Sequence, residues 1–220
     1  MRLFLPLLVL LTTCLSFAQQ PFTDVADSSF RSSINYLQSR GLIGGFPDGT
    51  FKPRQAMTRA EFLAMVLRAV PQADVPVGGQ CLAAMPAGVW YAPVMCQGVS
   101  LGLIGADLTQ LRPGDTIVYA EALKIVLGAW QFSVPEVSGG PWYQPYVQFA
   151  AENGILSSLA YRPTDFVTRE VAASILYRSM ILAGEDRPPL PAAEPDAGTV
   201  DSDPAPLPAA RACPTTITAP

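Results

Sequence analysis

The chain has 220 residues, of which 14 are basic and 18 acidic, a formal net charge of −4 and no histidine. Without histidine, Ser-His-Asp catalysis, Cys-His catalysis and histidine-ligated metal sites are excluded, and we predict neither a metal nor a cofactor. Six of the acidic residues and two of the basic ones follow Gly184, and Arg2 lies in the N-terminal segment, which leaves eleven basic and twelve acidic residues in the body. This nearly neutral body lacks the basic face of a nucleic-acid-binding protein.

The first 18 residues, MRLFLPLLVLLTTCLSFA, have the pattern of a secretory signal peptide. One basic residue precedes an apolar run that ends in Ser16-Phe17-Ala18, so we expect cleavage before Gln19. An uncut membrane anchor is one alternative, although the run is short for a membrane span. A lipoprotein processed at Cys14 is another, with Thr13 in the position where Gly, Ala or Ser is usual. We expect an exported mature chain without a membrane span.

Export places the cysteines where disulfides can persist. Cys14 leaves with the signal peptide, and Cys81 and Cys96 flank one short segment. We expect these two to form a disulfide, with two free buried thiols as the alternative. Cys213 is then left over, so it is either free or paired with another chain.

The body of the chain consists of three repeats. An apolar–basic–proline signature recurs at spacings of 60 and 50 residues, as Phe51-Lys52-Pro53, Leu111-Arg112-Pro113 and Tyr161-Arg162-Pro163. Three further related elements accompany it in the same order: 29–39, 90–100 and 142–152; 40–45, 101–106 and 153–158; and 57–70, 117–130 and 167–180. This pattern predicts helix–loop–helix units that need their neighbours to complete a core, over 22–70, 81–130 and 139–183.

Apolar spacing predicts both helices of the first unit. Core-facing stripes run through Phe30, Ile34 and Leu37 in the first helix and through Phe62, Met65, Val66 and Ala69 in the second. Gly41, Gly102 and Gly154 are expected to end the three first helices in the left-handed region. Asp48-Gly49 predicts a tight turn, and the acidic ligands of a calcium loop are missing around it.

The second helix of the first unit is predicted to begin with a capping box. Thr58 and Glu61 have the T-x-x-E spacing, which makes Thr58 the N-cap and Arg59 the first helical residue. The third unit repeats Thr168-Arg169 but has Val171 in place of the glutamate. The second unit keeps Glu121 but has Tyr119 in place of the arginine, and all three helices keep their apolar stripe.

Residues 184–220 break the repeat pattern. They are rich in proline, alanine and aspartate and have few large apolar side chains. Such a segment cannot bury enough surface to offset its ordering entropy, so we predict a disordered, extended tail.

FTDV (22–25), GLIGGFPDGTFKP (41–53) and MTRAEF (57–62) resemble the S-layer homology (SLH) domain. The resemblance covers three repeats from about Phe22 to Ala183. It is nearly complete in the first repeat and weaker in the other two, which share a Trp-Tyr-x-Pro element at 90–93 and 142–145.

The resemblance implies an all-α fold in which three helix–loop–helix repeats form a pseudo-threefold bundle. It also implies grooves between repeats that bind an anionic cell-wall polysaccharide, commonly pyruvylated, or a peptidoglycan-linked glycan. By the same resemblance, Arg59 and Arg169 contact the ligand carboxylate and Trp90 and Trp142 line the grooves. The groove served by Tyr119 would lack its anion clamp.

The position of the two arginines also supports an anion site on physical grounds. A cation at the first turn of a helix opposes the helix dipole, whereas a guanidinium beside free N–H groups can grip a carboxylate. The structural alternative is that Arg59 and Arg169 pair with an acid of the next repeat or are only solvated.

The other predicted groove residues also have structural interpretations. We expect most of each indole of Trp90 and Trp142 to be buried, with one edge in a groove. Lys52, Arg112 and Arg162 recur before proline, either on the groove rims or as the solvated face of a loop.

The sequence therefore predicts a non-catalytic, exported module of the cell envelope or cell surface. A glycan hydrolase using Glu61 and Glu121 is a second hypothesis, although both residues have structural explanations as cap partner and helix former. A third is an adaptor that recruits an exported protein through the tail or Cys213.

Overall fold

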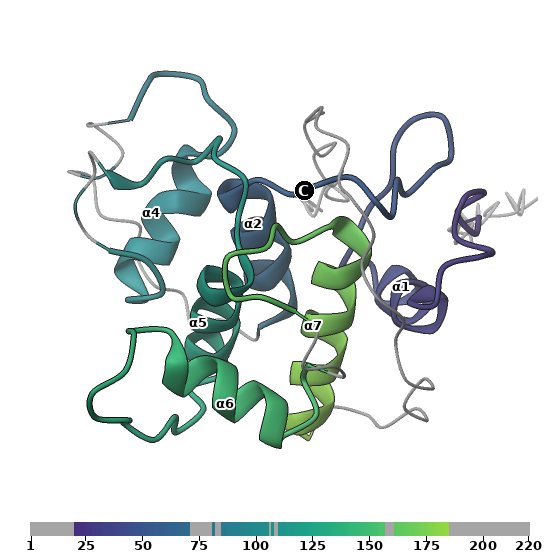
Figure 1. Cartoon of the computed structure of the whole chain (residues 1–220). Helices are drawn as coiled ribbons and strands as arrows, with labels where there is room; N and C mark the ends of the chain where they lie inside the picture. Colours follow the sequence, from purple (N-terminus) through teal and green to yellow (C-terminus); the bar gives the residue numbers. More distant parts are fainter. Residues whose placement is uncertain are drawn as a thin grey trace, which may run out of the picture.

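The computed structural model describes residues 20–70, 81, 85–105, 107, 110–156 and 161–184. These residues form six helices and no strand, so the predicted all-α class is confirmed (Figure 1). The helices are α1 (Arg31–Ser39), α2 (Arg59–Ala69), α4 (Ala92–Ser100), α5 (Tyr119–Ala129), α6 (Gln144–Glu152) and α7 (Arg169–Leu182). The predicted signal peptide, the tail after Gly184 and Cys213 lie outside the described residues.

The helices form an inner set and an outer set. The second helices of the repeats, α2, α5 and α7, pack on one another at the centre. Each first helix packs on the second helix of the preceding repeat: α4 on α2, α6 on α5 and, closing the cycle, α1 on α7 (Figure 1). Each repeat therefore completes its neighbour's core, as the repeat pattern predicted.

A ring of three backbone hydrogen bonds closes this cycle. The amide of Met57 donates to the carbonyl oxygen of Val167 at 3.0 Å, and the amide of Val167 to that of Ile117 at 3.0 Å. The amide of Ile117 donates back to the carbonyl oxygen of Met57 at 2.9 Å. All three residues are fully buried, so these polar groups have no access to water and depend on one another.

The start of each central helix is fixed by the loop of the next repeat. The first two amides of α2 donate to the carbonyl oxygens of Asp115 and Pro113 at 2.9 and 3.1 Å. The equivalent bonds run from α5 to Asp165 and Pro163, and from α7 to Gln55 and Pro53. Amides that a helix leaves without an internal partner are thus satisfied by a neighbouring repeat.

The local predictions agree with the structure. The seven residues of the two predicted apolar stripes are all buried. Gly41, Gly102 and Gly154 have φ values of 69°, 69° and 70°, in the left-handed region. In the predicted capping box, the hydroxyl of Thr58 accepts from the Glu61 amide at 3.3 Å, and the Glu61 carboxylate accepts from the Thr58 amide at 2.8 Å.

A disulfide joins Cys81 to Cys96, as predicted. Cys96 is fully buried in α4, so the bond ties the first residue of the second repeat to the first helix of that repeat. The two cysteines are 15 residues apart in the sequence. Cross-linking a loop of this size stabilises a fold by about 3 kcal/mol in the chain-entropy treatment.

We therefore expect Cys81→Ser with Cys96→Ser to lower the free energy of unfolding by about 3 kcal/mol. Urea denaturation would measure this loss, with Cys213→Ser in both the variant and its reference so that no free thiol can exchange. Coincident unfolding curves would contradict the stabilising role of the disulfide.

Candidate functional site

The first residues of the three central helices lie at the boundaries between repeats. Arg59 begins α2, Tyr119 begins α5 and Arg169 begins α7, as predicted. The Nε–H of Arg59 donates to the carbonyl oxygen of Leu111 at 3.1 Å, and that of Arg169 to the carbonyl oxygen of Phe51 at 2.7 Å. Each arginine therefore contacts the apolar–basic–proline loop of the following repeat.

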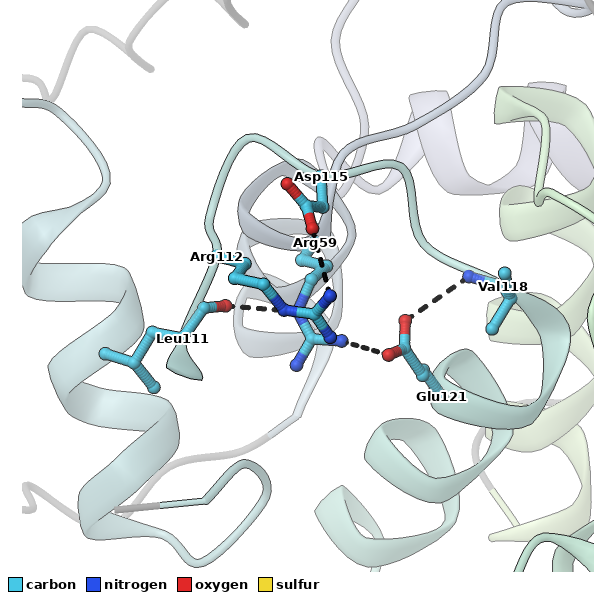
Figure 2. A network of polar contacts seen from close by, with 6 residues as sticks. All are labelled: Arg59, Leu111, Arg112, Asp115, Val118 and Glu121. Atoms are coloured by element: carbon cyan, nitrogen blue, oxygen red, sulfur yellow. Dashed lines mark hydrogen bonds and ion pairs between the residues drawn. The ribbon is translucent and has the colours of Figure 1, made fainter. Parts of the chain in front are cut away.

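Arg59 forms an ion pair across its boundary. Its Nη1 pairs with a carboxylate oxygen of Glu121 in the first turn of α5, and the other oxygen accepts from the Val118 amide at 3.4 Å (Figure 2). The side chains of Arg59 and Glu121 keep 13% and 24% of their surface exposed. The Arg59 side chain at this boundary is therefore partly open to solvent.

Arg169 is enclosed at the equivalent boundary. The residue is only 1% exposed, and its Nη2 donates to the carbonyl oxygen of Gly44 at 2.9 Å. Its guanidinium lies 4.6 Å from the ring centroid of Phe51 and 5.1 Å from that of Phe46. Burial lowers the pKa of Arg169 to about 10, although the nearby carboxylates of Glu61 and Asp24 act in the opposite direction.

Phe46 separates this buried cation from an exposed one. The ammonium of Lys52 lies 4.1 Å from the Phe46 centroid, so the ring contacts both Lys52 and Arg169. Lys52 is exposed and has a positive φ of 54°. The Asp24 carboxylate holds this conformation by accepting from the Phe51 and Lys52 amides at 2.7 and 2.8 Å.

The remaining boundary is apolar. Tyr119 is 2% exposed, and its ring stacks on that of Tyr161, with 4.7 Å between centroids and 23° between planes. Tyr161 is the counterpart of Phe51 and Leu111, so the phenol ring takes the place that a guanidinium occupies at the other two boundaries.

The residue type at the third position of each central helix depends on the first residue of the preceding central helix. After an arginine the third residue is a glutamate, and after the tyrosine it is a valine. Arg59 faces Glu121, Arg169 lies in the field of Glu61, and in α7, which follows Tyr119, the third residue is Val171. The sequence predictions treated the missing arginine and the missing glutamate as separate losses. Both positions belong to the same boundary. Because arginine and glutamate are replaced there together, the sequence already indicated that Glu121 pairs with Arg59.

The prediction of free N–H groups beside the arginines is wrong. The first two amides of α2, α5 and α7 donate to carbonyl oxygens of the next repeat, and the third amide of α2 and α7 donates to a threonine hydroxyl. Packing of the repeats therefore occupies the groups that would have bound an anion. An anion at these boundaries has to be held by side chains.

The predicted burial of the two tryptophans is also wrong. Trp90 and Trp142 are 43% and 55% exposed. Both precede their helices, α4 and α6, by two residues and lie outside the buried stripes. Each packs its edge against the next tyrosine, with 5.9 Å from Trp90 to Tyr91 and 5.7 Å from Trp142 to Tyr143 between centroids.

The ammonium of Lys124 in α5 lies 5.8 Å from the Trp142 ring, a partner that the sequence reasoning missed. The tryptophans contact tyrosines and Lys124, whereas the two arginines contact loop carbonyls, Glu121 and phenylalanine rings.

The basic residues before proline all lie on the surface. Lys52, Arg112 and Arg162 are exposed, and Arg112 forms an ion pair with Asp115 at 3.3 Å (Figure 2). Among the described residues, no cluster of His, Cys, Asp or Glu side chains could hold a metal. Nor do those residues include a helix with the length and hydropathy that a membrane span requires.

Two segments of the chain, residues 21–63 and 137–173, match the S-layer homology domain. These segments contain Arg59, Trp142 and Arg169, whereas Tyr119 and Trp90 lie between them.

Three relatives illustrate the similarity to curated proteins. The chain is 29% identical over 172 residues to an exoglucanase, XynX, of Acetivibrio thermocellus, which covers 71% of this chain and 16% of that protein. Two proteins of the same organism match over 48 residues and 21% of this chain: cell surface glycoprotein 1 at 50% identity and a cellulosome-anchoring protein at 42%. These matches cover 2% and 11% of their lengths, so the chain spans a small part of all three relatives.

Moving a charged pair into the apolar boundary tests how the first and third helix residues are coupled. We expect Tyr119→Arg alone to lower the free energy of unfolding by about 2–3 kcal/mol, because the guanidinium loses water without gaining an acid. Adding Val171→Glu should recover about 1–2 kcal/mol of this loss.

Urea denaturation of the wild type, both single variants and the double variant forms a complete double-mutant cycle. Additive losses would contradict the coupling across the boundary.

Proposed function

We propose that this chain, two segments of which (21–63 and 137–173) match the S-layer homology domain, anchors to the cell envelope by binding an anionic cell-wall polysaccharide. The proposed ligand carries carboxylate groups, such as pyruvate ketals. The module is proposed to be exported, to act at the cell surface and to catalyse no reaction.

The observation that carries this proposal is the partly exposed side chain of Arg59 at the boundary of the first and second repeats. Arginine presents a planar set of donors that matches a carboxylate, which lysine does not. The side chain of its partner, Glu121, is 24% exposed and also accepts a hydrogen bond from the Val118 amide. A ligand carboxylate can therefore join this ion pair without entering the core.

The other proposed contacts are of two kinds: the aromatic surfaces of tryptophans and cationic side chains. Trp90 and Trp142 have exposed indole faces on which a sugar ring can pack. At the boundary of the third and first repeats, Arg169 is covered and Lys52 is the exposed cation. We propose that Lys52 meets the ligand there, and that Arg169 contributes directly only if the Phe46 ring moves aside. Arg112 and Arg162 are proposed rim contacts.

The names of two relatives agree with an anchoring role. One is a cellulosome-anchoring protein and another a cell surface glycoprotein. A relative named as an exoglucanase shares with this chain only 16% of its length, so its activity is not transferred here. The carboxylates first considered for catalysis have other roles, since Glu61 is buried in a capping box and Glu121 pairs with Arg59.

We predict that Arg59→Gln weakens binding of the full chain to cell-wall sacculi that retain their secondary polymers by about tenfold or more. Arg59→Lys should give an intermediate loss, because it keeps the charge but not the planar donors. Co-sedimentation with sacculi would measure both.

Arg54→Gln is the matched control, because Arg54 is an exposed arginine five residues before Arg59. Thermal unfolding of each variant would separate a loss of binding from a loss of folding. Undiminished co-sedimentation of a folded Arg59→Gln variant would refute the proposed site.

A further inference from the structure

The third repeat has a surface pocket that the arginine boundaries do not use. It has a volume of about 440 Å³ and lies along α6 and the turn before it. This volume is in the range of small-ligand sites. In Figure 1, α6 lies at the lower edge of the bundle, and the buried residue of this helix is Ala150. Much of its surface therefore remains open to a ligand.

The lining of this pocket is mainly apolar, and three of its residues also carry hydrogen-bonding groups. Pro141, Tyr143 and Val147 supply the apolar wall, and Gln144, Gln148 and Glu152 supply amides and a carboxylate. The Gln148 amide donates to the Glu152 carboxylate at 2.8 Å, which orders both groups on one side of the pocket. A sugar ring has the complementary surface, with apolar C–H groups on its face and hydroxyls around its edge.

Trp142 is an exposed aromatic residue next to the pocket lining in the sequence. Trp142 lies between Pro141 and Tyr143 in the sequence, both of which line the pocket. Its ring is held by edge contacts with Tyr143 at 5.7 Å and Tyr146 at 6.3 Å between centroids, yet the residue remains 55% exposed. Fixed aromatic surface of this kind binds with a small loss of side-chain entropy.

The charge of the pocket sets it apart from the Arg59 boundary. Among the described residues that line it, Glu152 is the charged one, and Lys124 approaches Trp142 from α5. An acidic sugar would be repelled by this carboxylate, whereas hydroxyl or acetamido groups can donate to it.

We infer that the α6 pocket, with Trp142 beside it, binds an uncharged sugar residue. This inference rests on the proposed function, because it gives the module a second contact to a glycan whose acidic groups are held at Arg59. The two sites would bind different parts of the same polymer.

Calorimetric titration of the full chain with two neutral trisaccharides, maltotriose and tri-N-acetylchitotriose, tests this inference. At least one should bind saturably, and Gln148→Ala and Trp142→Ala should each weaken it about tenfold. Gln110→Ala, which removes another exposed glutamine, should leave it unchanged. In Lys52→Gln/Arg59→Gln, which lacks Lys52 and Arg59 as contacts for an acidic ligand, tri-galacturonate should bind more weakly than the neutral trisaccharides, and adding Glu152→Gln should raise its affinity.

The inference is overturned if neither neutral trisaccharide binds, if Gln148→Ala binds as the wild type does, or if tri-galacturonate binds Lys52→Gln/Arg59→Gln better than the neutral trisaccharides do. It is also overturned if a peptide of residues 187–195, RPPLPAAEP, binds the pocket and neither sugar does. Sacculus binding without trisaccharide binding would remove this inference alone. Trisaccharide binding without sacculus binding would remove the proposed function and leave the pocket.

Discussion

The ring of backbone hydrogen bonds through Met57, Val167 and Ile117 is the constraint on which the rest of the structure depends. Each bond joins a different pair of repeats, and all three are buried. The ring brings the loop of each repeat against the start of the preceding central helix. Every boundary therefore contains the same three parts: the first residue of one helix, the loop of the next repeat and the third residue of its helix.

This construction determines what can bind an anion. A helix N-terminus is ordinarily a suitable place for a carboxylate, because its first amides are unpaired. Here those amides donate to loop carbonyls of the next repeat, so the helix starts hold the fold together. The first side chain of each central helix then decides the chemistry of the boundary. Arg59 is partly exposed, Arg169 is buried between backbone carbonyls and aromatic rings, and Tyr119 makes its boundary apolar.

The sequence was sufficient to predict what depends on local pattern. Helix periodicity, the Thr58 capping box, the left-handed glycines and the Cys81–Cys96 pair all follow from residues close together in the chain. The cyclic packing of α1 on α7 could be expected from the repeats, but the ring of hydrogen bonds could not. Every residue except proline has the same backbone amide, so residue types do not indicate where such bonds form.

Burial at the site was the least predictable property. Trp90 and Trp142 were expected to be largely buried and are exposed, because a large apolar residue before a helix need not face the core. Arg169 is a buried residue, whereas the Arg59 side chain is partly exposed, although both stand in the same motif. The difference arises from Phe46, which lies against the guanidinium of Arg169 from a loop far away in the sequence.

Hydrogen exchange at the amides of Met57, Ile117 and Val167 in the disulfide-bonded full chain tests the central claim most directly. If the ring makes one cooperative unit of three repeats, all three amides should exchange only through global unfolding, with the same free energy of opening. Exchange of one of them through a smaller, local opening, while the other two remain protected, would contradict this account.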